Sequence, residues 1–576
     1  MPRCRGIVAT GSPRHHGGMT TPPSEICNVA ARLTRMAQAM PDAVAVVEPR
    51  AHDASRSRQY GQVTFRELDQ DSDRIARGLR ERGVRPGTRL VLLVRPGIDF
   101  VSLVFGLLKS GAVSILIDPG MGRRNLLRCL AETRPEGFVA VPAVHAVRVL
   151  LRGRFRRARL HVTVGRRWFW GGVTLDQLRG APWSGPELAA TTADDPAAII
   201  FTTGSTGPPK GVLYTHGNFD AQVDQIRDFY GIEPGEVDLP GFPLFGLFNC
   251  AMGVTTVVPD MNPSRPAKVD PRNILEAVED WRVTQTFGSP AIWDAVGRYC
   301  RDRGLRLATV RRVLSAGAPV PADVLSRINE CINPDGEVHT PYGATEALPV
   351  SSIGAAEVLG ETAERTARGA GVCVGRRFPG IEWRVIRIVD GPVPSLGQAE
   401  PLPPGQIGEL IVTGPVVTRQ YVTHVEAERL AKIPDGRRTW HRMGDAGYLD
   451  EKHRFWFCGR VAHRVVTARG PMYPVCCEAI FNRHPDVLRS ALVGVGPRAA
   501  QRPVVVVEPL PGRFPRNTLA QDRLVTELED LARSHSLTEP IRTFLVRTTF
   551  PVDIRHNAKI FRERLAVWAA RRLGAG

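Results

Sequence analysis

The sequence predicts a layered α/β protein that has a large N-terminal domain and a small, mobile C-terminal α/β domain. The chain of 576 residues is long enough for one large domain and one smaller domain. Helical and extended patterns alternate between Tyr60 and Asp118, as they do in parallel sheets that are covered by helices. Near the other end, a buried strand at 504–507 precedes an amphipathic helix at 519–534.

The alternation after Tyr60 defines the first expected elements. Thr64 is a residue type that caps helices, and the apolar face of the helix after it includes Leu68, Ile75 and Leu79. The pattern then predicts a strand at 89–94, a helix at 99–108 and a buried strand at 112–118. This region is therefore expected to form parallel strands that are joined by helices.

A stretch rich in Gly, Ser and Thr separates two short apolar strands, at 197–201 and 212–214. Glycines let backbone N–H groups turn inward and hydroxyls add donors, so such a stretch can surround a phosphate. It is not a Walker A motif, because Pro209 precedes the lysine and Gly211 follows it. An ordinary hairpin turn is the alternative, although two residues would suffice for one. We therefore predict a phosphate-binding loop formed by Thr202, Thr203, Gly204, Ser205, Thr206, Gly207 and Lys210.

A second motif, Tyr342-Gly343-Ala344-Thr345-Glu346, carries side chains that suit a nucleotide. Tyr342 offers a flat face for a purine, and the hydroxyl of Thr345 can bind an α-phosphate. Glu346 is a hard oxygen ligand for Mg²⁺ that is bound to phosphates. Taken alone, the motif is as compatible with a turn and a helix capped by Thr345, but the upstream loop favours the nucleotide.

These motifs, in this order, resemble the signature motifs of the acyl-adenylate-forming enzymes: acyl-CoA synthetases, luciferases and adenylation domains. The resemblance implies a large ATP- and acyl-binding domain at 23–460, a small lid domain at 461–576, and ATP and Mg²⁺ as cofactors. It implies that adenine lies against Gly317, Ala318 and Pro319 as well as Tyr342 and Gly343. It further implies that Asp445 binds the ribose, that Arg460 reaches ribose or phosphate, and that Lys559 is catalytic together with Lys210, Glu346 and Thr345.

The same resemblance places an acyl pocket beside the aromatic cluster at 242–248, a pattern that by itself is most often core. Many members carry a histidine where Gly246 stands, and we expect the missing side chain to leave room for a bulky acyl group. The substrate contacts implied are Phe242, Phe245, Gly246, Phe248, Ser289 and Trp293.

The sequence departs from the common pattern at the expected hinge, because Ala462, two positions past Arg460, stands where Asp or Lys is usual, and His463 follows it. Together with the stretches 118–127, 242–245 and 553–559, this departure resembles the β-lactone synthetases of bacterial long-chain olefin biosynthesis. The implied reaction converts a long-chain 2-alkyl-3-hydroxy acid to an acyl-AMP, which its own 3-hydroxyl then closes to a β-lactone. Two alternatives are a long-chain acyl-CoA synthetase and a non-catalytic nucleotide-binding subunit of an assembly. His463 and His556 are candidate bases, as is the departing phosphate.

Composition limits the partners and the location. The net charge is +18, but nearly all basic residues are arginine and no nucleic-acid module is recognisable, so we expect no nucleic acid.

The ten cysteines contain no Cys-x-x-Cys pair, and neither a signal peptide nor a transmembrane run is visible, so we expect a reduced, cytoplasmic protein. Residues 1–22 are expected to be a disordered or non-native extension, with Met19 a candidate start. Other olefin-pathway enzymes are candidate assembly partners.

The region 147–172 is the most basic part of the chain and ends in Trp168-Phe169-Trp170. A surface that meets anionic lipid, as a peripheral membrane contact, or an acidic partner protein is one interpretation. A solvated insertion enriched in arginine by codon bias is the other.

Overall fold

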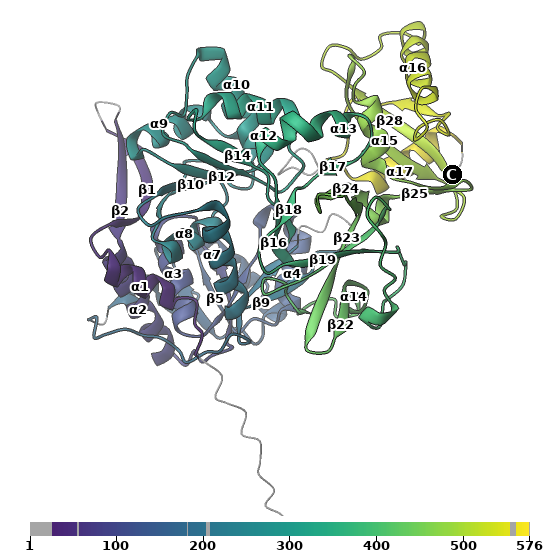
Figure 1. The fold of residues 1–576 in the computed structure, drawn as a ribbon. Helices are drawn as coiled ribbons and strands as arrows, with labels where there is room; N and C mark the ends of the chain where they lie inside the picture. The colour runs from purple at the N-terminus through teal and green to yellow at the C-terminus, as the bar shows by residue number, and fades with distance from the viewer. Residues whose placement is uncertain (1–25, 54–56, 181, 203–207, 553–559, 575–576) are drawn as a thin grey trace, which may run out of the picture.

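The computed structural model describes residues 26–53, 57–180, 182–202, 208–552 and 560–574. Two large sheets dominate this part of the chain (Figure 1). One has the order β14-β13-β12-β10-β11-β1-β2. Its strands are β1 (Val44–His52), β2 (Arg58–Thr64), β10 (Val237–Pro240), β11 (Thr255–Val257), β12 (Gln285–Gly288), β13 (Arg312–Ser315) and β14 (Glu337–His339).

The other large sheet has the order β21-β9-β8-β4-β3-β5-β6-β7. The run from β8 to β7 is parallel, whereas β9 is antiparallel to β8, and β21 is antiparallel to β9. Its strands are β3 (Arg89–Leu93), β4 (Val113–Leu116), β5 (Gly137–Ala140), β6 (Leu160–Thr163), β7 (Val173–Thr174), β8 (Pro196–Phe201), β9 (Gly211–Thr215) and β21 (Gln420–Tyr421). The expected layered α/β class is confirmed.

A layer of helices separates the two sheets. One core cluster joins Val46 of β1 and Leu90 of β3 to Leu103 of the helix between them, so both sheets pack on the same layer. The next residue of β3, Val91, belongs to a cluster on the opposite face of its sheet, because side chains alternate along a strand. This middle layer includes α1 (Ala31–Ala39), α2 (Phe65–Glu81), α3 (Ile98–Lys109), α7 (His216–Tyr230) and α8 (Phe245–Met252).

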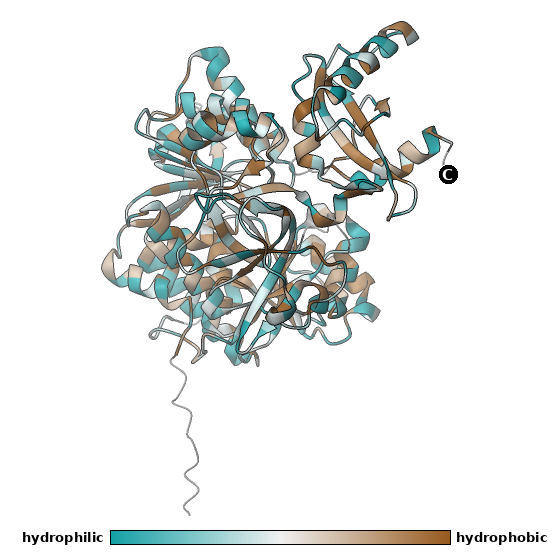
Figure 2. Ribbon diagram, turned by 45° about the vertical axis from the view of Figure 1, so that its right-hand side comes forward, coloured by the Kyte–Doolittle hydropathy of each residue, from teal (hydrophilic) through white to brown (hydrophobic). Residues whose placement is uncertain are grey.

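Further helices cover the outer faces of the two sheets. Leu130 of α4 packs with Val91 on one side, and Ile274 of α9 packs with Val313 of β13 on the other. Figure 2 shows the apolar residues of the strands enclosed by helices whose outward faces are polar. The covering helices include α4 (Arg123–Glu132), α5 (Pro142–Leu150), α9 (Pro271–Trp281), α10 (Pro290–Arg303), α11 (Ala322–Cys331) and α12 (Ala355–Glu357). The short helix α6 (Leu175–Arg179) instead packs beside α2 in the middle-layer core, and α13 (Ala363–Ala367) follows α12 along the chain.

The elements expected after Tyr60 form close to the predicted positions. Thr64 caps α2 with a full capping box, since its hydroxyl accepts from the Glu67 N–H and the Glu67 carboxylate accepts from the Thr64 N–H. Asp69 and Asp73 of α2 hold the buried amine of Lys109, each at 2.6 Å. This ion-paired lysine ties α2 to α3 inside the middle layer.

A third sheet has the order β17-β24-β23-β20-β19, with β22 beside β23, and lies next to the short sheet β15-β16-β18 (Figure 1). Its strands are β17 (Val372–Cys373), β19 (Glu382–Ile386), β20 (Gly408–Thr413), β22 (Lys432–Asp435), β23 (Arg438–Leu449) and β24 (Phe455–Arg460). The short sheet is built from β15 (Tyr342–Ala344), β16 (Ala347–Ser352) and β18 (Arg376–Arg377), and α14 (Glu426–Ala431) precedes β22.

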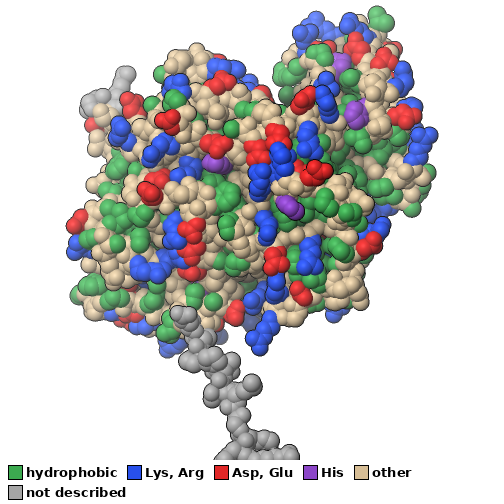
Figure 3. Space-filling model, in the orientation of Figure 1, with side chains coloured by type: hydrophobic (Ala, Val, Ile, Leu, Met, Phe, Trp, Pro, Cys, Tyr) green, Lys and Arg blue, Asp and Glu red, His purple; other side chains and the backbone are tan. Residues whose placement is uncertain are grey.

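After β24 the chain builds separate sheets with their own cores, which Figure 1 shows set apart from the body. The surface is notched where these C-terminal elements meet the body (Figure 3). The elements are β25 (Val465–Thr467), β26 (Gly470–Met472), α15 (Pro474–Phe481), β27 (Val487–Val495), β28 (Arg502–Pro509), α16 (Thr518–Arg533), β29 (Phe544–Val546) and α17 (Arg562–Arg572). No helix in the described ranges is long and apolar enough to cross a membrane.

A buried carboxylate under the middle layer predicts a pH-dependent stability. Asp238 of β10 is 4% exposed and accepts a hydrogen bond from the Asn249 amide at 2.7 Å. Burial raises the pKa of Asp238 from 3.8 to about 7, so the folded protein keeps a proton that the unfolded chain releases. The contribution of Asp238 to the free energy of unfolding is therefore fully present below about pH 4 and is lost as the pH rises to about 7.

Replacing Asp238 by Asn removes this titration. We expect Asp238→Asn to raise the melting temperature relative to the native protein above about pH 7, and to lose that advantage below about pH 4. Thermal unfolding at both pH values measures the difference. The exposed Asp335→Asn is the matched control, and an equal shift at both pH values for Asp238→Asn would contradict the prediction.

Candidate nucleotide and acyl site

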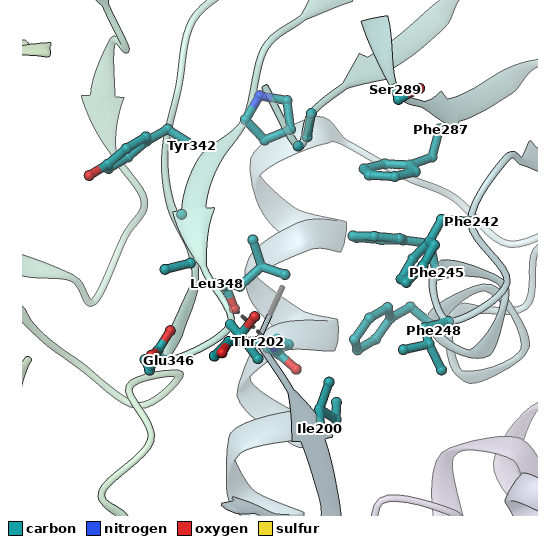
Figure 4. Close-up of a pocket in the computed structure, with 18 of the residues that line it drawn as sticks. Ile200, Thr202, Phe242, Phe245, Phe248, Phe287, Ser289, Tyr342, Glu346 and Leu348 are labelled. Atoms are coloured by element: carbon teal, nitrogen blue, oxygen red, sulfur yellow. Dashed lines mark hydrogen bonds between the residues drawn. The ribbon is translucent and has the colours of Figure 1, made fainter. Parts of the chain in front are cut away.

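A cavity of about 590 Å³ opens between the helical layer, the ends of the large sheets and the third sheet. Figure 4 shows Phe242, Phe245 and Phe248 on one side of it, and Tyr342 and Glu346 on the other. Phe245 stacks on Phe287 of β12, with ring centroids 3.6 Å apart, so the aromatic wall is packed from both elements. The cavity thus has a polar end and an apolar end.

The β8–β9 hairpin places Lys210 at the polar end. Phe201 pairs with Gly211 across the hairpin, and the next residue, Thr202, exchanges two hydrogen bonds of 3.0 Å with Lys210. The Lys210 ammonium lies 5.1 Å from the centre of the Tyr421 ring. The strand-to-strand connection predicted from the sequence is present. Residues Thr203, Gly204, Ser205, Thr206 and Gly207 lie outside the described residues.

The Tyr342–Glu346 motif forms β15 and a turn into β16, not a helix. The turn is held from two sides, because the Tyr214 hydroxyl donates to the Thr345 carbonyl at 2.5 Å and Thr418 donates to the Glu346 carbonyl. The Tyr421 hydroxyl donates to Oε1 of Glu346 at 2.7 Å. These contacts fix the Thr345 and Glu346 side chains at the rim of the cavity.

A buried lysine, Lys432 of β22, supports this turn from behind. It donates to the Thr418 carbonyl, and burial lowers the pKa of Lys432 to about 8, against the opposing charge of Glu346. Burial, and then the charge of Glu346, also raise the pKa of Tyr421, so its phenol remains a donor. The sequence reasoning missed Tyr214, Tyr421 and Lys432, because no local motif connects them to Glu346.

The residues at the polar end fit Mg²⁺ that arrives with phosphates. Among the described residues no group of three or more His, Cys, Asp or Glu side chains could form an all-protein metal site. Mg²⁺ is usually held by one or two carboxylates together with substrate phosphates and waters, which matches a single Glu346 beside Lys210. Tyr421 donates to Oε1 of Glu346, and within the described ranges no side chain bonds to its other carboxylate oxygen.

Replacing Glu346 by Gln should raise the Mg²⁺ requirement without changing the fold. An amide keeps the acceptor for Tyr421 but loses the charge, so we expect the Mg²⁺ concentration for half-maximal activity to rise at least about tenfold. A Mg²⁺ titration of pyrophosphate release measures it. Glu361→Gln, on an exposed residue paired with Lys452, is the control. An unchanged Mg²⁺ requirement would remove Glu346 from the metal site.

Asp445 lies on β23 at the floor of the polar end and is 4% exposed. Its Oδ2 accepts from the Tyr342 hydroxyl at 2.5 Å, and its Oδ1 accepts from Arg460 at 2.7 Å. Burial, and then Asp445, raise the pKa of Tyr342, and Asp445 raises the pKa of Arg460, so both partners stay protonated. Each carboxylate oxygen keeps a further lone pair for a ribose hydroxyl. The Tyr342–Asp445 bond was not predicted from the sequence.

Gly317, Ala318, Pro319 and Gly343 also line the cavity. Gly317 has φ of +94°, which favours glycine, and a Cβ on Gly343 would lie 2.7 Å from the Ala347 carbonyl oxygen. The hydroxyl of the neighbouring Ser315 is buried without a partner in the described structure, although it faces this cavity. Such an orphaned polar atom fits a polar ligand at this end.

Two predicted substrate residues do not line the cavity. A Cβ on Gly246 would meet the Thr256 methyl at 3.0 Å, so the missing side chain makes room for β11 and not for an acyl group. Trp293 is 2% exposed and packs under Gly288 in the core behind β12. Both expectations are corrected, because the packing of α8 and α10 directs Gly246 and Trp293 away from the cavity. Phe242, Phe245, Phe248 and Ser289 do line the cavity, and the Ser289 hydroxyl is another buried atom without a partner there.

The C-terminal candidates are placed only in part. Lys559 and His556 lie outside the described residues, but Ile560 pairs with Val552, and Arg562 is held by Glu478 at 2.8 Å. Ala462 and His463 lie in a short helical turn, Val461–His463, directly after β24. His463 contacts Glu563 at 2.9 Å, and burial lowers the pKa of His463, which favours its neutral form. This contact links the turn after β24 to α17, which carries Glu563.

Comparisons with known proteins agree with this geometry. The chain is 46% identical to the olefin beta-lactone synthetase of Xanthomonas campestris pv. campestris, over 96% of this chain and 99% of that protein. It is 46% identical to the enzyme of the same name from Stenotrophomonas maltophilia, over 95% and 99%. The amide bond synthetase McbA from Marinactinospora thermotolerans has a similar fold, with a TM-score of 0.76 at 22% identity over 94% and 99% of the two chains. The profile described as AMP-binding enzyme matches residues 33–422, and the chain belongs to this family.

Proposed function

We propose that this protein activates a long-chain 2-alkyl-3-hydroxy acid with ATP and closes it to a β-lactone, releasing pyrophosphate and AMP. The observation that carries the proposal is one cavity with a nucleotide-suited end and an aromatic, apolar end, in a chain 46% identical over nearly its full length to olefin beta-lactone synthetases. Mg²⁺, held by Glu346 with the phosphates, would neutralise charge on the triphosphate.

In the first half-reaction a carboxylate oxygen of the substrate attacks the α-phosphorus, and the bond to pyrophosphate breaks. Lys210, at the polar end of the cavity, would draw charge from the phosphates, and Thr345 and Tyr342 line the same cavity. Asp445 and Arg460 form the base of this end, where they would orient the ribose. The aromatic wall of Phe242, Phe245 and Phe287 would hold the alkyl chains in an environment without water.

In the second half-reaction the 3-hydroxyl oxygen attacks the activated carbonyl, its proton leaves, and the bond to AMP breaks. The nucleophile is part of the substrate, so no external thiol needs to enter. Holding the hydroxyl against the carbonyl replaces a bimolecular encounter, an effect worth up to about 7–11 kcal/mol for ideal alignment. The phosphate of AMP would accept the proton, since His463 is bonded to Glu563.

Product analysis separates this function from that of an acyl-CoA synthetase. We expect ATP, Mg²⁺ and a 2-alkyl-3-hydroxy acid to give a β-lactone and AMP at the same rate with and without CoA. The matched acid without the 3-hydroxyl should give pyrophosphate but no lactone. A thioester that requires CoA, with no lactone, would overturn the proposal, and the absence of any pyrophosphate release would favour a non-catalytic subunit.

A further inference from the structure

The part of the chain from β5 to the first residue of α6 is unusual in charge. Residues 137–175 contain no Asp or Glu, although the chain as a whole has 58 of them. Within it, residues 152–169, here called the basic aromatic segment, run along the outer edge of the eight-stranded sheet, where β6 and β7 are the last strands. This edge is distant in sheet order from the β8–β9 hairpin that carries Lys210.

The arginines of this segment are exposed and lack acidic partners. Arg148, which precedes the segment, instead contacts His161 and the Trp170 carbonyl. Within the described part of the chain, no arginine of the segment forms an ion pair, whereas Arg179 just beyond it binds both Asp71 and Asp99. The unneutralised, exposed arginines are Arg152, Arg154, Arg156, Arg157, Arg159, Arg166 and Arg167.

Large apolar side chains project from the same segment. Trp168 is 61% exposed and Phe169 is 76% exposed. Their neighbour Trp170 is buried, stacks on His145 with ring centroids 5.9 Å apart, and donates to the Thr163 hydroxyl at 3.0 Å. Trp168 in turn stacks on Trp170 at 5.8 Å. The exposed rings are therefore held in place by a buried anchor and do not fold back into the core.

We propose that the basic aromatic segment docks this protein on the surface of an anionic phospholipid bilayer. Arginines attract the anionic headgroups, each adding about fivefold to the partition, and aromatic rings settle at the boundary of headgroups and acyl chains. An anionic bilayer surface fits this segment, because its arginines have no acidic partner within the described chain and no helix or strand covers the rings of Trp168 and Phe169. An acidic protein could form ion pairs with the arginines, but those ion pairs would not account for the exposed rings of Trp168 and Phe169.

Vesicle sedimentation with the full chain tests this proposal. We expect the native protein to sediment with vesicles of phosphatidylglycerol and phosphatidylethanolamine, but not with vesicles of phosphatidylcholine alone, and to be released by high salt. Trp168→Ser with Phe169→Ser should weaken the partition at least about tenfold. Arg156→Gln with Arg157→Gln should weaken the partition about 25-fold, the product of two fivefold factors.

A matched control lies on the C-terminal elements, where the exposed Phe514 is followed closely by Arg516. Phe514→Ser with Arg516→Gln should leave vesicle binding unchanged. All variants should keep native activity toward a short-chain, water-soluble 3-hydroxy acid, which shows that they fold. Absence of binding to anionic vesicles at low salt would overturn the proposal in favour of an acidic protein partner. Unchanged binding by the Trp168 and Phe169 variant would also overturn it.

Discussion

Replacing Lys559 by Ala is expected to lower pyrophosphate release by about 10²–10³-fold, because it removes a preorganised charge at the developing pentavalent phosphorus. Lysine is scarce in this chain, which has six, and the segment that carries Lys559 begins and ends at a fixed pair, Val552 and Ile560. Arg562, bound to Glu478, then anchors the start of α17. We propose that the amine of Lys559 serves the first half-reaction and not the second.

Separate half-reactions test that assignment. Lys559→Ala supplied with preformed acyl-AMP should still release AMP and β-lactone, because the lysine acts before ring closure. Lys452→Ala is the matched control, since Lys452 is exposed and paired with Glu361 at 2.8 Å. Pyrophosphate release by Lys559→Ala within about tenfold of the native rate would contradict the prediction.

Replacing Asp445 by Asn should weaken productive ATP binding by about 10²-fold. The carboxylate is buried and receives both Tyr342 and Arg460, while the Arg460 side chain is about a third exposed. The free-energy cost of breaking the Asp445–Arg460 pair therefore lies between about 1 kcal/mol, as for an exposed pair, and about 3–5 kcal/mol, as for a buried pair. Loss of the ribose contacts adds to it. The KM for ATP in pyrophosphate release measures the effect.

A comparison of nucleotides distinguishes a ribose contact from a structural role. The native protein should prefer ATP to 2′-deoxy-ATP and 3′-deoxy-ATP, and Asp445→Asn should lose most of that preference. Asp435→Asn, which removes a carboxylate charge beside Trp440 on the neighbouring strand β22 but keeps an acceptor, is the control and should keep that preference. A variant that binds ATP weakly but still discriminates against the deoxynucleotides would show that Asp445 acts only through packing.

The few lysines of this chain serve structural as well as catalytic positions. Lys210 lies at the cavity, but Lys109 and Lys432, two of the other lysines, are buried supports. Lys109 joins two helices through Asp69 and Asp73, and Lys432 holds the turn that carries Glu346 from behind. In this chain a lysine marks a place where a compact ammonium fits, which includes structural positions as well as catalytic ones.

The sequence alone determined the α/β class, the hairpin between 197 and 214, and the chemical types gathered at the polar end. These follow from local rules, because strand and helix periodicity and a run of Gly, Ser and Thr are visible within a short window. Only the tertiary structure decided that Tyr421 and Tyr214 brace the Glu346 turn, and that Gly246 and Trp293 face away from the cavity. The direction of a side chain depends on which layer packs against its element, and residues far apart in the sequence fix that packing.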